Sequence, residues 1–197
     1  MSPIKLIVAG AGHLGRYHAQ KAAALDCIDL VGIIDIEPAK ASALAKEVGS
    51  QALPEYSSDI ADAMVVATTT SAHAEVACAA LDAGLHTLVE KPIAATLQEA
   101  TRMIDSASAN QRVLAVGHSE RYNPAVSAAL KLAHEPRYIT AERLSPFSGR
   151  SLDTDVILDL MIHDLDILSS LVKSPLKEAR AIGVPVLTNS VDMASAR

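Results

Sequence analysis

The stretch that decides the fold is IKLIVAGAGHLG, residues 4–15 of the chain. A short apolar run leads into Gly10, Gly12 and Gly15, which have the G-x-G-x-x-G spacing of a dinucleotide-binding turn. In such a turn the first glycine allows a tight bend, the second lets a pyrophosphate approach the backbone, and the third lets the following helix lie close to the sheet. The N–H groups and the dipole at the start of that helix attract the phosphates.

An acidic residue follows at the position where this kind of turn selects its cofactor. Asp35 lies twenty residues after Gly15 and closes a second apolar run, residues 28–34. A carboxylate there accepts hydrogen bonds from the adenosine ribose hydroxyls and repels a 2′-phosphate. A glycine-rich turn without a ligand is the alternative, but it explains neither the second strand nor the acid. The pattern therefore predicts binding of NAD, with NADP disfavoured.

Composition limits the class of protein. The 197 residues are 50% hydrophobic and carry a net charge of −6, with no basic block, so nucleic acid is not an expected partner. Cys27 and Cys78 lack metal or redox spacing, which favours a reducing compartment and no metal site. Neither a signal peptide nor an apolar run of about 18 residues is visible, so we expect a cytoplasmic chain without a membrane span.

Strands and helices alternate through the first part of the chain. Continuous runs rich in Val and Ile predict buried parallel strands at residues 4–9, 28–35, 63–68, 86–90 and 113–118. Helices are predicted between them at residues 13–25, 38–48, 71–83 and 96–109, the last opened by a capping box at Thr96 and Glu99. This alternation predicts an α/β fold, a Rossmann-type doubly wound parallel sheet, whose ligands bind beyond the carboxyl ends of the strands.

The pattern changes after about residue 120. A short helix is predicted from Asn123-Pro124, a strand at residues 137–144, a polar loop at 145–154 and a long helix at 155–172. Apolar stretches follow at residues 176–187 and 191–195. The last of these would leave an open sheet edge, which natural proteins avoid. We therefore interpret the sequence as the front part of a longer protein, with an incomplete second α/β domain.

The predicted long helix carries charge where a buried helix should not. Residues 155–171, DVILDLMIHDLDILSSL, are apolar on nearly every face, so we expect this helix to be buried. Its polar members recur along one stripe, formed by Asp155, Asp159, His163, Asp166 and Ser170. Two interpretations stay open: a solvated stripe or a satisfied His–Asp pair, and a polar cleft in which His takes a hydroxyl proton and Asp orients it or holds substrate.

The tripeptide Glu90-Lys91-Pro92 ends the fourth predicted strand, at the edge of the sheet where ligands are expected. A lysine at that edge can hydrogen-bond a sugar hydroxyl or lower the pKa of a neighbouring group through its charge. A surface lysine before a turn is the alternative. Position alone leaves both interpretations open.

Together these motifs resemble the Gfo/Idh/MocA family of nicotinamide-dependent sugar and polyol oxidoreductases. The motifs that carry the resemblance are the glycine turn, Asp35, ATTTSAH at residues 67–73, Glu90-Lys91-Pro92 and Asp159-x-x-x-His163. The resemblance implies an NAD-binding Rossmann domain at residues 1–120. It also implies, at residues 121–197, the start of an α/β substrate domain that normally continues further and often mediates oligomerisation, so we expect a homo-oligomer for the full-length form. Thr69-Thr70 departs from the proline that many relatives have in this loop.

The resemblance also implies roles for individual residues. The catalytic set is Lys91, Asp159 and His163, with His163 as general base, Lys91 stabilising charge on the reacting oxygen, and Asp159 orienting the substrate. The implied cofactor contacts are Gly10, Gly12, His13, Leu14, Gly15, Asp35, Thr68, Thr69, His73, Glu90 and Lys91. The implied substrate contacts are Lys91, Arg121, Tyr122, Asn123, Arg143, Asp159 and His163.

A narrower resemblance concerns HSERYNPA at residues 118–125, ERLSPF at 142–147 and DLMIHD at 159–164, which are similar to the branch containing UDP-N-acetylglucosamine 3-dehydrogenases. It implies NAD-dependent oxidation of the sugar 3-hydroxyl, a step toward the 2,3-diamino sugars of lipid A. Arg121, Arg143 and Arg150 are candidates to meet the nucleotide pyrophosphate, with surface salt bridging as the alternative. Two other functions stay open: an inositol or aldose dehydrogenase of the same family, and a non-catalytic NAD-binding sensor, which would not need the catalytic set.

Overall fold

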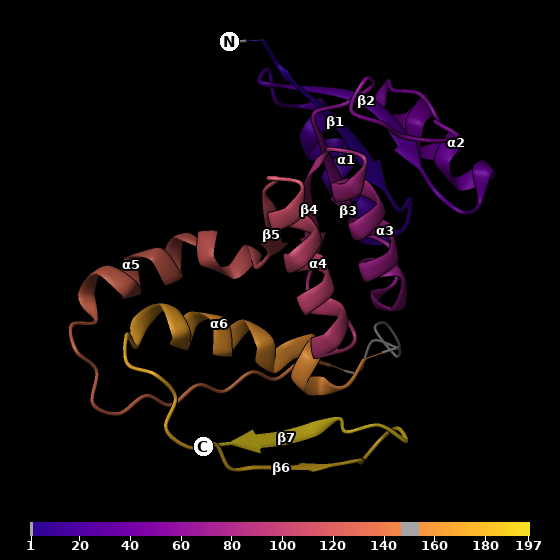
Figure 1. Cartoon of the computed structure of the whole chain (residues 1–197). Helices are drawn as coiled ribbons and strands as arrows, with labels where there is room; N and C mark the ends of the chain where they lie inside the picture. The colour runs from indigo at the N-terminus through magenta and orange to yellow at the C-terminus, as the bar shows by residue number, and fades with distance from the viewer. Residues whose placement is uncertain (1, 147–153) are drawn as a thin grey trace. The chain divides into compact units, whose positions relative to one another are not determined.

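The structure is a computed structural model that describes residues 2–146 and 154–197 (Figure 1). It divides into two compact units, Met1–Gly117 and His118–Arg197. Arg150, the Phe that ends the 142–147 motif, and most of the loop expected at residues 145–154 lie outside the described residues.

The first unit is built on a five-stranded parallel sheet with the order β2-β1-β3-β4-β5. The strands are β1 (Ile4–Ala9), β2 (Ile28–Ile34), β3 (Ala63–Val66), β4 (His86–Glu90) and β5 (Leu114–Gly117). The chain leaves β1 in one direction to β2 and in the other to β3, so a topological switch point lies at the carboxyl end of β1. The predicted Rossmann-type sheet is confirmed, with strand bounds within two residues of those expected.

Four helices cover the two faces of this sheet. They are α1 (His13–Ala23), α2 (Pro38–Val48), α3 (Thr70–Asp82) and α4 (Leu97–Ala109). Ile7 and Val8 are both fully buried, but Ile7 packs in one cluster with residues of α3 and α4, whereas Val8 packs in another with residues of α1 and α2. Successive strand residues face opposite sides of a sheet, so both faces are covered and continuous apolar runs result.

The local signals that begin helices act as the sequence indicated. Pro38 opens α2, and the capping box is complete, since the Glu99 N–H donates to Thr96 Oγ1 over 3.2 Å and the Thr96 N–H donates to a Glu99 carboxylate oxygen over 3.0 Å. In the second unit, Asn123 Oδ1 accepts the N–H of Ala125 over 3.0 Å and caps α5 (Pro124–Leu132).

The second unit contains few regular elements. A 3₁₀ turn, η1 (Ser119–Tyr122), precedes α5; a π-helical turn, η2 (Ile157–Met161), runs into α6 (Ile162–Leu171); and β6 (Ala181–Val184) pairs antiparallel with β7 (Met193–Ala196). Asp192 shapes the hairpin by accepting three backbone N–H groups between β6 and β7. Within the described ranges, no helix has the length and apolar character that crossing a membrane requires.

Two expectations for the second unit are wrong. The strand predicted at residues 137–144 is absent, because no neighbouring strand pairs with this segment, and its backbone has no regular structure. The predicted long helix forms, but it starts as a π turn and is only partly buried: its one buried residue is Asp166. Within its own unit α6 packs mainly on η1 and on the adjoining η2, and these short turns offer too little surface to bury every face of a helix.

Candidate active site

The glycine turn packs tightly at two of its three glycines. Gly10 has φ +101°, and a side-chain carbon there would lie 2.4 Å from the carbonyl oxygen of Ala67, at the end of β3. A side-chain carbon on Gly15 would lie 1.7 Å from the carbonyl oxygen of Gly10. Both positions exclude any side chain, because the obstructing atoms belong to the backbone. The turn is therefore held against the sheet on one side and against α1 on the other.

Gly12 differs from the other two glycines because space surrounds it. A side-chain carbon there would meet no atom within 4 Å, and φ is −76°, which any residue adopts. Gly12 is the N-cap of α1, and within the described residues no side chain caps this helix and no acid lies in its first turn, which contains His13 and Leu14. The first N–H groups of a helix need outside acceptors. Open space beside such donors fits the pyrophosphate of NAD.

Asp35 holds the glycine turn directly, which the sequence did not indicate. Its Oδ2 accepts the N–H of Ala11 over 2.6 Å, and its Oδ1 accepts the N–H of Glu37 over 2.8 Å. Each carboxylate oxygen has a second lone pair, so these bonds leave room to accept ribose hydroxyls. Asp35 thus links the end of β2 to the phosphate-binding turn, in addition to the cofactor contact expected for it.

The loop after β3 is fixed by a histidine that does not reach the surface. His73 is 2% exposed; its Nδ1 lies 2.9 Å from the Pro92 carbonyl oxygen and its Nε2 lies 3.3 Å from that of Thr68. The shorter contact favours the tautomer that donates from Nδ1. This burial does not fit the direct cofactor contact expected of His73. Its observed contacts link Thr68, next to Thr69, to the segment that follows Lys91.

Glu90 lies at the end of β4 in a polar cluster. Its Oε1 is 2.7 Å from Nε2 of His18 on α1, and its Oε2 accepts the backbone N–H of Lys91 over 3.1 Å. Burial favours a higher pKa for Glu90, but the hydrogen bond and charge of His18, with smaller contributions from Lys91, outweigh it and hold the pKa below its usual value. His18 is a site residue that sequence reasoning missed, since no motif marks it.

The polar stripe predicted for the long helix divides into separate roles. Asp155 is a helix cap, because its Oδ1 accepts the N–H groups of Ile157 and Leu158 over 3.1 and 2.9 Å. Ser170 donates to the carbonyl oxygen of Asp166 within its own helix over 3.0 Å. Such local bonds are typical of these residue types, so helix-capping rules would have found the role of Asp155.

The remaining stripe members lie where the helix changes its winding. Asp159 is in the π turn η2, and His163 is the second residue of α6. π-helical turns occur frequently at functional sites, and they break the 3.6-residue period on which a stripe depends.

In the same unit, Nδ1 of His118 is a buried ring nitrogen for which no hydrogen-bond partner is found within the described residues. A buried polar atom of this kind requires an explanation, such as a ligand or a water molecule.

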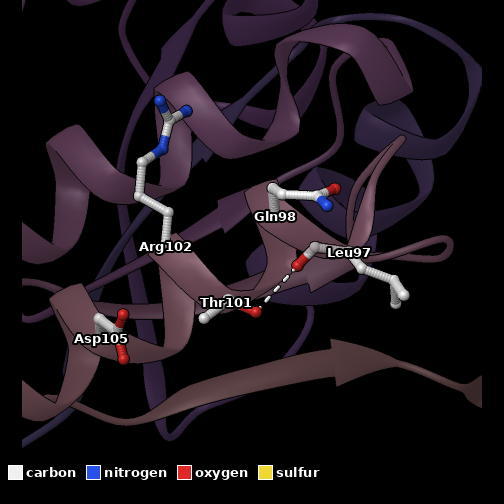
Figure 2. Close-up of a pocket in the computed structure, with 5 residues that line it drawn as sticks. All are labelled: Leu97, Gln98, Thr101, Arg102 and Asp105. Carbon is white, nitrogen blue, oxygen red and sulfur yellow. Dashed lines mark hydrogen bonds between the residues drawn. The ribbon is translucent and has the colours of Figure 1, made fainter.

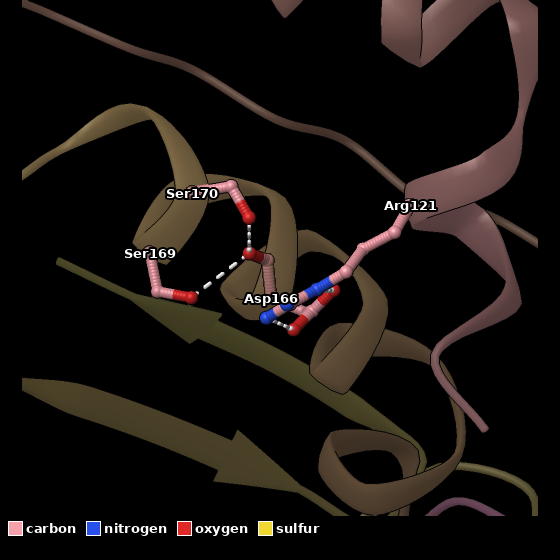
Figure 3. Close-up of polar contacts among 4 residues, drawn as sticks. All are labelled: Arg121, Asp166, Ser169 and Ser170. Atoms are coloured by element: carbon pink, nitrogen blue, oxygen red, sulfur yellow. Dashed lines mark hydrogen bonds and ion pairs between the residues drawn. The ribbon is translucent and has the colours of Figure 1, made fainter. Parts of the chain in front are cut away.

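Two arginines expected at the substrate form bidentate ion pairs with carboxylates of α6. Arg121 donates to both oxygens of Asp166 over 2.8 and 2.6 Å, a contact drawn in Figure 3 together with the serines that bond to the Asp166 carbonyl. Arg143 donates to Asp164 over 2.8 to 3.1 Å. The hydrogen bond from Arg121 is the main cause that holds the pKa of Asp166 below its usual value, against the effect of burial. Salt bridging therefore describes what these two arginines do in this structure.

We expect Asp166→Ala to lower the free energy of unfolding by about 2 kcal/mol at neutral pH, because a charged hydrogen bond at a side chain only 7% exposed is lost. Arg121 is 52% exposed, so water screens part of this effect. The folded-state pKa of Asp166 lies below its ordinary 3.8, so the pair's contribution is complete above that pH and is lost as pH falls through the folded pKa. Urea unfolding at about pH 7 and about pH 3 measures both quantities.

The matched control is Glu178→Ala, which breaks the exposed ion pair between Glu178 and Arg180 and should leave stability unchanged. Equal effects of the two variants at neutral pH would contradict the stabilising role of Asp166.

The two residues after Arg121, which were also expected to contact the substrate, differ in exposure and in their hydrogen bonds. Tyr122 is 84% exposed, and Asn123 is occupied as the cap of α5 and as a donor to Glu120 over 3.3 Å. Neither arrangement identifies a ligand. Within the described ranges, no three His, Cys, Asp or Glu side chains are arranged to hold a metal ion.

A shallow pocket lies elsewhere, on α4 (Figure 2). All of its lining residues come from one face of that helix, and Thr101 bonds back to the Leu97 carbonyl over 2.9 Å. The residues are Leu97, Gln98, Thr101, Arg102 and Asp105. None belongs to the glycine turn or to the expected catalytic set, so this pocket is not the candidate site.

Comparison with known proteins decides the family. The sequence profile described as the oxidoreductase family with the NAD-binding Rossmann fold, GFO_IDH_MocA, matches residues 4–118. The chain belongs to the Gfo/Idh/MocA family. The match covers the first unit from residue 4 onward and confirms the resemblance seen in the sequence, together with NAD as the cofactor of this fold.

Individual members of the Gfo/Idh/MocA family resemble the chain to different degrees. The UDP-N-acetylglucosamine 3-dehydrogenase of Acidithiobacillus ferrooxidans is 44% identical over 192 residues, 96% of this chain and 61% of the relative. A solved structure of that enzyme, GnnA, has a TM-score of 0.91 at 42% identity and matches 100% of this chain and 65% of its own. The inositol 2-dehydrogenase of Acidothermus cellulolyticus is 27% identical over 91% of this chain and 56% of the relative.

A solved structure of lower sequence identity supports the fold alone. GenD2 from gentamicin A biosynthesis, solved in complex with NAD, has a TM-score of 0.84 at 21% identity and matches 62% of its own length. The chain thus spans less than two thirds of each of these relatives.

Proposed function

We propose that the chain acts as an NAD-dependent sugar dehydrogenase that oxidises the 3-hydroxyl of UDP-N-acetylglucosamine to a ketone. The observation that carries the proposal is the similarity to the UDP-N-acetylglucosamine 3-dehydrogenase, which extends along nearly the whole chain and exceeds the similarity to the inositol 2-dehydrogenase. An inositol or aldose dehydrogenase is the second candidate, favoured by the number of inositol dehydrogenases among the more distant relatives.

In this proposal the first unit binds the cofactor. Gly12 and the uncapped start of α1 receive the pyrophosphate, and Asp35 receives the adenosine ribose. The Asp35 carboxylate would repel a 2′-phosphate, and its bond to Ala11 keeps the turn in place for the pyrophosphate. Preference for NAD over NADP follows from one side chain that both shapes the turn and carries the discriminating charge.

The proposed chemistry divides between bound NAD and three side chains. When bound, the nicotinamide accepts a hydride from the sugar carbon that bears the hydroxyl. His163 takes the hydroxyl proton as general base, and Lys91 donates a hydrogen bond to the same oxygen, stabilising the charge that develops as the proton leaves. Asp159 orients the sugar. The carbon loses a hydride and the oxygen loses a proton, so a ketone forms and the atoms balance.

The second part of the chain, residues 121–197, is proposed to be the start of the substrate domain. Support comes from the π turn that contains Asp159 and from the buried Nδ1 of His118, which a substrate polar group would satisfy. The ion pairs of Arg121 and Arg143 leave other guanidinium N–H groups for a pyrophosphate, because each guanidinium has five. Homo-oligomerisation and a cytoplasmic location remain part of this proposal for the full-length form.

The test is to record NADH fluorescence after mixing the chain with NAD and, separately, UDP-N-acetylglucosamine, myo-inositol or glucose, and to repeat the series with NADP. The proposal expects a signal with NAD and the nucleotide sugar only. Signal with a free polyol alone would favour the second candidate, and a stronger signal with NADP would contradict the role of Asp35. No signal with any sugar, while NADH still binds, would favour a sensor.

A further inference from the structure

The carboxylate of Glu90 is fixed on three sides, all within the first unit. His18 contacts one oxygen over 2.7 Å, the Lys91 backbone N–H donates to the other over 3.1 Å, and Gly117 of β5 lies against the group. A side-chain carbon on Gly117 would lie 3.0 Å from Glu90 Cδ, which is tighter than ordinary contact. The missing side chain at residue 117 therefore provides the space that the carboxylate occupies.

His18 is well placed to set the orientation of this carboxylate. The side chains of His18 and Glu90 are 26% and 13% exposed, so their contact is largely shielded from water. A charged hydrogen bond is stronger in such a shielded place than in water. The contact joins residues that are 72 positions apart, and therefore links α1 to the end of β4.

We propose that His18 is a positioning residue for Lys91 and acts through Glu90. By holding one oxygen of Glu90, His18 keeps the other oxygen on the Lys91 N–H, which fixes the peptide between residues 90 and 91 and thus the direction in which the Lys91 side chain starts. Pre-set geometry of this kind raises the rate of the chemical step, and a small displacement of a catalytic group can cost about 10²-fold. The inference rests on the proposed catalytic role of Lys91.

A purely structural clamp between α1 and β4 is the competing explanation. It predicts that loss of His18 loosens the whole unit, so that stability, NADH affinity and turnover decline together. A positioning role predicts a local loosening at Lys91 and a selective fall in kcat. Replacement of His18 by glutamine tests the contact itself, because the glutamine amide can still donate to Glu90 without carrying charge.

The experiment compares H18L, H18Q and the control H134L, which changes an exposed histidine in the second unit. Amide hydrogen exchange of Lys91 is measured by NMR in protein labelled with ¹⁵N-lysine, the Lys91 signal being identified by its loss in K91R. NADH affinity is measured by fluorescence and kcat by NADH formation. For H18L we expect Lys91 exchange to rise by about tenfold or more and kcat to fall by about 10- to 100-fold, with NADH affinity within about threefold.

H18Q should keep slow Lys91 exchange and most of the turnover, and H134L should match the wild type. Unchanged Lys91 exchange in H18L would overturn the inference, as would a uniform rise of exchange at the other lysine amides. If the wild type shows no turnover but H18L selectively speeds exchange at Lys91, the proposed function fails while the positioning by His18 stands. A wild type that turns over, with H18L equal to it in kcat, overturns the positioning role alone.

Discussion

We expect Lys91→Ala and His163→Ala each to lower kcat by about 10³-fold while NADH affinity changes by less than about threefold. A positioned general base contributes about 10² to 10⁴ in rate, and a donor to a developing oxyanion contributes a similar factor. Neither side chain is part of the packing of the glycine turn, in which Gly10 and Gly15 contact backbone atoms. Turnover is followed by NADH fluorescence with saturating NAD, and binding by titration with NADH.

Matched controls are Lys131→Ala and His134→Ala, which change an exposed lysine and an exposed histidine outside the proposed machinery. Both should keep wild-type turnover. Turnover that survives in both Lys91→Ala and His163→Ala would contradict the catalytic set. Loss of turnover with equal loss of NADH binding would instead indicate that the change damages the cofactor site.

The second large effect is expected at the third glycine. Gly15→Ala should lower the free energy of unfolding of the first unit by at least about 3 kcal/mol and abolish NADH binding. The added carbon would overlap the Gly10 carbonyl oxygen at 1.7 Å, and this backbone atom cannot yield without moving α1 off the sheet. The gain of about 1 kcal/mol in helix propensity from alanine does not offset this overlap. Urea unfolding followed by circular dichroism gives the stability.

Gly12→Ala is the informative comparison, because it adds the same carbon in open space. It should fold normally but bind NADH at least about tenfold more weakly, since the new methyl group occupies the space assigned to the pyrophosphate. Gly49→Ala, at φ +73° beyond the end of α2, controls for strain without a clash and should keep full NADH affinity. Normal NADH binding by Gly12→Ala would contradict the assigned position of the pyrophosphate.

Most of the first unit could be predicted from the sequence, because its signals are local. The spacing of Gly10, Gly12 and Gly15, the continuous apolar strands and the capping box at Thr96 each depend on neighbours a few positions away. The bounds of β1, β4 and α2 agree with the expected ones, and those of the other strands differ by one or two residues. Alternation of short apolar runs with helices was sufficient to predict a parallel sheet covered on both faces.

The second unit was predicted less well, because its structure depends on contacts that the local sequence pattern does not specify. Residues 137–144 have the composition of a strand but form none, since a strand exists only where another pairs with it. The stripe on the long helix was extrapolated with a period of 3.6, whereas the π turn Ile157–Met161 interrupts that period. Asp166, taken as one stripe member among five, is instead the one buried residue of α6.

The sequence by itself determined the Rossmann fold and the glycine turn, because spacing along the chain encodes backbone bends and helix starts, and it marked Asp35 as the acid proposed to select NAD. Only the tertiary structure decided which charged groups meet. His18 and Glu90 are 72 positions apart, and Arg121 and Asp166 are 45 apart. The choice between such partners depends on which elements become neighbours in space, and on how far burial strengthens a pair once water is excluded. The spacing of residues along the chain specifies neither which elements become neighbours nor how deeply a pair is buried.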